Sequence, residues 1–262
     1  MRILVCVKRV PAPGSKINIT ADGTAVDTTN LGFTVSPHEE CAVEAAVQLI
    51  EGHGGDATVL TLGSVEAGEQ LRYAVSVGIQ RAVLLPTAGE EWDPQRTARA
   101  ITSAIRQLES ADGPFDAILF GNESADSGGF QVGIRVAHAL GRPMVNGAKG
   151  LSIDDGIARV QREADAGRET YELPLPAVIG VKEGINLPRY PTMRGRLASK
   201  KVEVASIDPA DATSGPMAGA VTGPTTIALR PPPERTSETV ILGTGPDAAV
   251  AVVDVLDEIG VL

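Results

Sequence analysis

The feature that most constrains the fold is a regular alternation of short apolar runs with helical patterns. The apolar runs cover 2–7, 57–62, 80–85, 116–120 and 175–181, and the helical patterns cover 36–52, 66–76, 93–108 and 132–140. Apolar runs of this length between Gly, Pro and Asp are typical of buried strands. Strands that alternate with helices predict an α/β fold, in which a parallel sheet is covered by helices on both faces.

The helical pattern at 36–52 begins with a strong start signal. Ser36 is placed to cap the helix, Pro37 occupies its first position, and Glu39 completes a capping box. Ligands of parallel sheets bind where the carboxyl ends of the strands meet. We therefore expect this helix start, the segment 7–11, Leu62 and the segment after 120 to converge on one crevice.

The remainder of the chain predicts smaller elements. Residues 16–34 turn at 21–23, and 157–164 with 168–173 form a small β-hairpin. Residues 184–199 have no clear period and predict an exposed, ordered loop. Residues 206–235 are rich in Pro, Gly, Ala and Thr and predict an extended C-terminal arm, followed by a short helix at 247–259. The predicted division is a domain at 1–204 and an arm with its helix at 205–262.

Composition excludes several classes of function. The formal net charge is −10, which argues against nucleic acid and anionic membranes as partners. Cys6 and Cys41 form no Cys-x-x-Cys pair, and no apolar run approaches the ~20 residues that cross a bilayer. No secretory signal precedes the first strand, so a cytoplasmic location is expected. No catalytic residues and no metal ligands can be assigned from the pattern.

The segment GNESADSGGFQVG at 121–133 lies between an apolar strand and a helix start. Free N–H groups of such a loop and of the first helical turn can hold a phosphate, although glycines there also serve turn geometry alone. Asp126 could orient a ligand or form an Asx-turn. Lys8 and Arg9 could meet a phosphate or face solvent.

Four separated motifs occur together in this chain. They are VCVKRVP, SPHEECAVEAA, GNESADSGGFQVGIRVAHALGRP and LPAVIGVKEGINLPRYPTMRGRLASKK. In this order and spacing, residues 1–204 resemble the beta subunit of electron transfer flavoprotein. The resemblance implies a Rossmann-like sheet of the adenine-nucleotide-binding type. It also implies a heterodimer with an alpha subunit that holds most of the FAD. Such a carrier takes electrons from acyl-CoA dehydrogenase-type enzymes, passes them to a quinone oxidoreductase, and turns over no substrate of its own.

The resemblance also implies that the beta subunit binds a structural AMP. Carried over by position, Cys6 contributes backbone or packing, and Asp126, Gln131 and Val132 lie nearest the nucleotide. The full set implied is Cys6, Ser36, Pro37, His38, Glu39, Leu62, Gly121, Asn122, Glu123, Ser124, Ala125, Asp126, Ser127, Gly128, Gly129, Phe130, Gln131 and Val132. His38 stands where the family often has an aromatic residue near the flavin, and Pro13 where it often has tyrosine.

By the same resemblance, the segment after 181 is a partner-recognition loop. Ile185 takes the position of the apolar anchor, and Leu187 replaces the family's usual acid. The implied recognition residues are Ile185, Asn186, Leu187, Pro188, Arg189 and Tyr190. The C-terminal arm and helix are expected to pack on the alpha subunit.

Three alternatives remain open from the sequence. A bifurcating type of beta subunit would hold a second FAD in place of AMP, although residues 20–27 lack the Gly-Thr-Leu-x-Arg element usual in those proteins. A stand-alone ATP-binding protein would need a metal-binding carboxylate, for which Asp126 is the candidate. A purely structural partner would leave the crevice empty.

Overall fold

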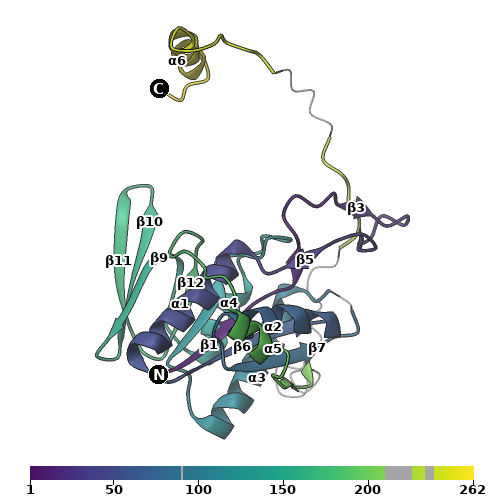
Figure 1. Ribbon diagram of the computed structural model, residues 1–262, viewed down its shortest axis with the longest axis vertical. Helices are drawn as coiled ribbons and strands as arrows, with labels where there is room; N and C mark the ends of the chain where they lie inside the picture. The colour runs from purple at the N-terminus through teal and green to yellow at the C-terminus, as the bar shows by residue number, and fades with distance from the viewer. Residues whose placement is uncertain (90, 210–225, 234–238) are drawn as a thin grey trace.

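The computed structural model describes residues 1–89, 91–209, 226–233 and 239–262. Within these residues the chain builds a nine-stranded sheet with the order β11-β10-β9-β12-β8-β1-β6-β7-β13 (Figure 1). The strands are β1 (Arg2–Cys6), β6 (Asp56–Gly63), β7 (Arg81–Pro86), β8 (Ala117–Gly121), β9 (Met144–Asp154), β10 (Ile157–Ala164), β11 (Gly167–Pro174), β12 (Ala177–Val181) and β13 (Val204–Ser206).

The sheet is parallel from β9 through β12, β8, β1, β6 and β7 to β13. Among the described residues of this sheet, the antiparallel pairings are those of β10 with β9 and with β11. Each of the five apolar runs that the sequence predicts as strands lies in this sheet. The predicted Rossmann-like α/β class is confirmed.

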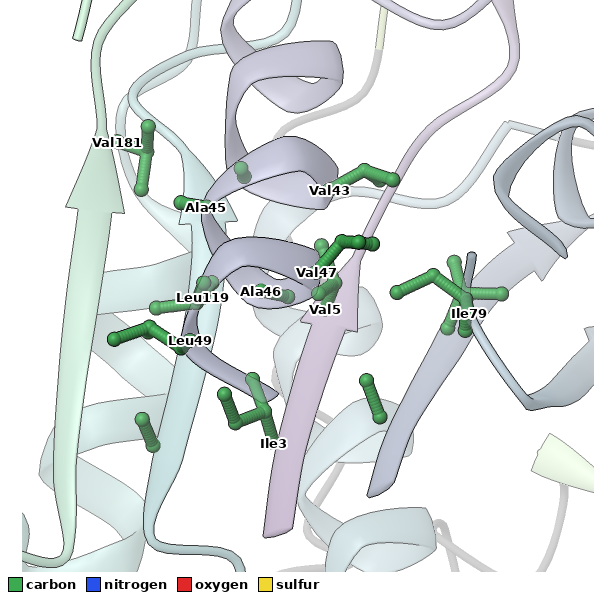
Figure 2. Packing of buried hydrophobic residues seen from close by; sticks show 14 of the residues in the cluster. Ile3, Val5, Val43, Ala45, Ala46, Val47, Leu49, Ile79, Leu119 and Val181 are labelled. Atoms are coloured by element: carbon green, nitrogen blue, oxygen red, sulfur yellow. The ribbon is translucent and has the colours of Figure 1, made fainter. Parts of the chain in front are cut away.

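Helices cover both faces of the sheet. Alternate residues of β1 enter different clusters: Ile3 and Val5 pack with α1 (Pro37–His53) and α2 (Gly68–Ser76), whereas Leu4 and Cys6 pack with α3 (Pro94–Asp112) and α4 (Val132–Leu140). Figure 2 shows α1 lying over the sheet, with Ala46, Val47 and Leu49 beside Ile3, Val5 and Leu119. A strand that is buried on both faces needs a continuous apolar run, and RILVC provides it.

Helix α1 begins as the sequence predicts. Ser36 accepts from the Glu39 N–H and the Glu39 carboxylate accepts from the Ser36 N–H, so the capping box is complete, with Pro37 in the first turn. Ser36 is fully buried, which fixes the start of α1 relative to the sheet. The predicted starts of α3, at Asp93 and Pro94, and of α4 are also confirmed.

Several elements were not predicted, among them β9, β13 and a short helix after Thr192. β9 has the sequence MVNGAKGLSID, in which glycines and a lysine break the apolar pattern, and only Val145, Ala148 and Ile153 are buried. β13 is three residues long and is held by pairing with β7. The last part of the predicted loop 184–199 is the short helix α5 (Met193–Ser199), capped by Thr192 and packed on α2. These elements depend on contacts with neighbours that are distant in the sequence.

The two predicted hairpins are confirmed. In the first, β3 (Asn18–Ile19) pairs with β4 (Val26–Asp27), and at its base β2 (Val10–Pro11) pairs with β5 (Phe33–Thr34). In the second, β10 and β11 are joined by a turn at Asp165 and Ala166 and project beyond the body of the sheet (Figure 1).

The C-terminal arm is described in part. Its segment 226–233 passes the first hairpin, where the Leu229 N–H donates to the Gly23 carbonyl at 2.8 Å. Positions 210–225 and 234–238 of the predicted arm lie outside the described residues. The predicted terminal helix is present as α6 (Ala248–Glu258), which buries none of its residues and lies away from the sheet (Figure 1). The predicted boundary between 204 and 205 falls inside β13 and stays a prediction.

In the part of the chain that the structure describes, no helix combines the length and the apolar character needed to cross a membrane.

Candidate functional site

The order of the strands reverses between β1 and β8. From β1 the chain passes through α1 to β6 and through α2 to β7 on one side, and α3 then carries it back to β8 on the other side of β1. At such a point the connections from two neighbouring strands leave in opposite directions, which opens a crevice at the carboxyl ends. The candidate site is this crevice between β1 and β8.

Lys8 bridges the crevice. Its Nζ lies 2.5 Å from Oδ2 of Asp126 and 3.1 Å from Oε1 of Glu91. The segment after β1 and the loop after β8 therefore converge as predicted. Burial would lower the pKa of Lys8, but Asp126 and Glu91 outweigh it and raise that pKa. Burial would raise the pKa of Asp126, but Lys8 holds it below its ordinary value. Both groups are charged at neutral pH.

The floor of the crevice contains the buried carboxylate of Glu39. Its Oε1 accepts from the Lys8 N–H at 2.9 Å and its Oε2 from the Ser36 N–H at 3.2 Å. Burial raises the pKa of Glu39 from its ordinary 4.5 to about 8, against the N–H donors of Ser36 and Lys8, which lower it.

Gly121 lets the start of α1 approach the end of β8. A Cβ atom at position 121 would lie 2.6 Å from Cγ of Glu39 and 3.3 Å from both the Glu39 nitrogen and Cβ of His38. No side chain fits in this space. The glycine that the sequence singles out as a loop start is therefore required for close packing of α1 on β8.

Cys6 is the last residue of β1, and Leu62 lies at the end of the neighbouring strand β6. Cys6 is buried, and burial together with the charge of Glu39 raises the pKa of its thiol, so the thiol stays protonated. Leu62, at the end of β6, packs on the cluster beneath α3 and α4. Both side chains act in packing.

The loop from Asn122 to Phe130 is held by its own turns and by its neighbours. The Asn122 N–H donates to the Val181 carbonyl at 2.8 Å, and Oε1 of Glu123 lies 3.4 Å from Nε2 of His38. Within the loop, the Ser124 and Ser127 hydroxyls share a hydrogen bond of 2.8 Å. The Asp126 carboxylate meets Lys8 and also accepts from the N–H of the next residue, Ser127, whereas an Asx-turn would use the N–H two residues on. A role of Asp126 in orienting a ligand stays a prediction.

The starts of α1 and α4 differ in what they offer a ligand. The first turn of α1 is closed by its capping box. At α4 the residue before the helix is Gln131, whose side chain makes no cap and instead accepts from Arg135 at 2.9 Å and 3.2 Å. The first N–H groups of α4 therefore remain for an anion, and the Arg135 guanidinium stands beside them. Arg135 was not predicted as a site residue, although its spacing of four residues from Gln131 on a helix indicates the contact.

The side chain of Phe130, two residues before α4, is half exposed. Its backbone has a φ of 51°, a conformation that is rare for a residue with a bulky side chain. Gly128, with a φ of 56°, precedes it. The loop thus adopts the left-handed backbone conformation twice, at Gly128 and at Phe130, shortly before the start of α4.

The segment after β12 is an exposed surface with apolar side chains. Leu187 is 89% exposed, Tyr190 91% and Met193 76%. Ile185 is half buried, packs on the cluster beneath α1, and lines a groove of about 410 Å³ between α1 and β9. Met193 and the exposed Leu197 lie outside the predicted recognition set. They are four residues apart and follow the helix cap Thr192, so their spacing indicates one face of a short helix.

Arg189 ties this segment to α1. Its guanidinium donates to both carboxylate oxygens of Glu44, at 2.8 Å and 3.0 Å, and to both of Glu51, at 2.7 Å and 2.9 Å. The hydrogen bonds to these carboxylates raise the pKa of Arg189 above its ordinary value. The structure thus brings together the predicted nucleotide residues at one end of α1 and the predicted recognition residues along its side.

The fold and the site define an α/β protein of the doubly wound type, with its ligand crevice at the switch point of the sheet. The family model described as "Electron transfer flavoprotein domain" matches residues 24–212. The chain is 38% identical to the electron transfer flavoprotein subunit beta of Syntrophomonas wolfei over 82% of each chain. It is 35% identical to that of Mycobacterium tuberculosis over 90% of each, and 31% identical to that of Bacillus subtilis over 79% of each.

The family model includes the loop after β8 and the segment after β12, and the similarities to the relatives span most of the chain. The chain belongs to the family of electron transfer flavoprotein beta subunits.

Replacing Gly121 by alanine should destabilise the protein. The new methyl group must displace Glu39 and the start of α1, at a cost of about 1–3 kcal/mol. Urea unfolding followed by circular dichroism measures the loss. Gly129→Ala in the same loop is the matched control, because a Cβ there meets no atom within 4 Å. Equal stability of the Gly121→Ala and Gly129→Ala variants would contradict the close approach.

The buried carboxyl of Glu39 should make stability depend on pH. Its pKa is about 8 in the fold against 4.5 ordinarily, so the folded state binds more protons between these values. The contribution of Glu39 to the free energy of unfolding is therefore fully present below pH 4.5 and is lost as pH rises toward 8. Between pH 4.5 and pH 8, the Tm measured by thermal unfolding should fall less with rising pH for Glu39→Gln than for the wild type.

The exposed Glu203 supplies the control for this measurement. Glu203→Gln should keep the pH slope of the wild type. A slope that is unchanged in Glu39→Gln would assign the effect to another group.

Proposed function

We propose that this chain pairs with an electron transfer flavoprotein alpha subunit, holds AMP in the crevice between β1 and β8, and displays the segment after β12 to electron donors. The observation that carries the proposal is the open start of α4 at the switch point of the sheet. Its first N–H groups have no side-chain cap, and the loop before it is fixed across the crevice by Lys8 and Asp126.

The residues of the crevice fit a nucleoside monophosphate. The first turn of α4 offers backbone N–H donors to the phosphate, and Arg135 in the same helix supplies positive charge. The half-exposed ring of Phe130 offers a face on which a base can stack. Because Ser36 and Glu39 are buried in the capping box, their part is to hold α1 in place, and the exposed Pro37 is the residue of this group that a ligand can reach.

FAD, held mostly by the alpha subunit, would supply the redox chemistry of the heterodimer. This chain's part is to bind the alpha subunit, to keep the crevice filled and to orient the donor-facing segment. We therefore assign it the role of a carrier subunit without substrate turnover of its own. The apolar side chains of α6, all unburied, and the described arm support the proposal that this end of the chain packs on the alpha subunit.

The donors proposed are dehydrogenases of the acyl-CoA type, and the acceptor is a quinone oxidoreductase. Leu187, Tyr190 and Met193 support a docking role for the segment 184–199, because they present apolar area on an ordered scaffold. A cytoplasmic location completes the proposal and agrees with two cysteines that are both buried and unpaired.

Nucleotide content tests the crevice assignment. The purified heterodimer, denatured and analysed by chromatography, should release one AMP and one FAD. Two FAD molecules would instead identify a bifurcating beta subunit, and release of ATP with steady hydrolysis would identify an ATP-binding protein. Gln131→Ala should weaken AMP retention by about tenfold through loss of a polar contact near a charged phosphate. Gln107→Ala, on the exposed side of α3, is the control.

Electron uptake tests the docking surface. Replacing Leu187, Tyr190 and Met193 together by alanine should raise the KM for an acyl-CoA dehydrogenase about tenfold or more, because three exposed apolar contacts are removed. Flavin and AMP content should stay at wild-type values. Ile185→Ala is the informative comparison: an effect on KM alone would make Ile185 the anchor, as its position predicts. An effect on stability alone would assign it to the core.

A further inference from the structure

Helix α1 connects the nucleotide crevice to the donor-facing segment, and His38 stands where the two meet. Its Nδ1 accepts from the Glu183 N–H at 2.8 Å, at the start of the segment after β12. Its Nε2 lies 3.4 Å from Oε1 of Glu123, in the loop after β8. The His38 side chain is only 12% exposed, so the imidazole is enclosed between these two neighbours.

The two contacts require different atoms of the ring. Because Nδ1 accepts from a backbone N–H, the neutral imidazole carries its proton on Nε2, which faces the Glu123 carboxylate. One flat ring thus connects a side chain of the crevice loop to the backbone of the donor-facing segment. A displacement of Glu123 changes the orientation that the ring prefers, and with it the hydrogen bond to Glu183.

The remainder of the segment is fixed to α1 without the crevice loop. The Asn186 side chain donates to the Cys41 carbonyl at 3.0 Å, and Arg189 holds Glu44 and Glu51. These contacts lie further along the same side of α1. The start of the segment, at Glu183, is therefore the part that can respond to the crevice, while the end near Arg189 stays anchored.

We propose that His38 is a positioning residue that couples AMP binding in the crevice to the conformation of the donor-facing segment at Glu183. This inference rests on the proposed function, because it takes AMP as the ligand of the crevice. When AMP fixes the loop after β8, Glu123 holds the imidazole, and the imidazole holds the Glu183 N–H. The coupling is reciprocal, so a partner that fixes the segment also favours AMP binding.

Hydrogen–deuterium exchange in the purified heterodimer tests the coupling. The measurement follows peptides that cover 183–192, with AMP removed and with AMP at saturation, and equilibrium dialysis measures AMP binding in the same samples. In the wild type, AMP should slow exchange at Glu183 about fivefold or more. Exchange near Arg189 should change less than twofold, since its contacts with Glu44 and Glu51 do not involve the crevice loop.

Two substitutions separate the contacts of the ring. His38→Asn retains an acceptor at the position of Nδ1 and removes the group that faces Glu123, so exchange at Glu183 should stay slow and lose its response to AMP. His38→Ala removes both contacts, and exchange should be fast with or without AMP. His138→Asn, on the exposed side of α4, is the matched control and should behave as the wild type.

The outcomes distinguish this inference from the proposed function. AMP that binds in dialysis without changing exchange at Glu183 would overturn the coupling and leave the nucleotide site intact. The same holds if His38→Asn responds to AMP as strongly as the wild type. Failure of the wild-type heterodimer to bind AMP would overturn the nucleotide assignment itself, and the coupling with it.

Discussion

The close contact between α1 and β8 is the constraint on which the site depends. Gly121 leaves room for Glu39, and Glu39 in turn accepts from the backbone of Lys8 and of Ser36. One buried carboxylate therefore joins the end of β1, the start of α1 and the end of β8. This arrangement determines where the crevice opens, because the three segments meet at the point where the strand order reverses.

The same constraint separates the roles of the two helix starts at the crevice. The start of α1 is capped by its own side chains and forms one side of the crevice. The start of α4 has no side-chain cap, so its first N–H groups can bind a ligand. Fixing α1 also fixes what lies along its side. His38, Glu44 and Glu51 hold the segment after β12, so a single rigid helix supports both the proposed nucleotide site and the proposed docking surface.

The sequence predicted the parts of the fold in which local pattern and burial agree. RILVC and AVIGV are buried on both faces and can be recognised as continuous apolar runs, and the Ser36–Glu39 capping box is a local signal. β9 and α5 could not be predicted, since β9 is mostly half buried and α5 is a short helix held by packing on α2. The exposure of Leu187 and Tyr190 beside a half-buried Ile185 is likewise a property of the folded segment, because all three are apolar residues of one irregular loop.

The sequence by itself determined the family, through four motifs in a fixed order, and the parallel sheet with helices on both faces. The sheet follows from apolar periodicity and capping residues, which act over a few residues. Only the tertiary structure decided that Lys8 pairs with Asp126, that Gly121 is required by Glu39, and that His38 links two loops. Each of these contacts joins residues far apart in the chain, and their distance is set by how the strands are ordered in the sheet.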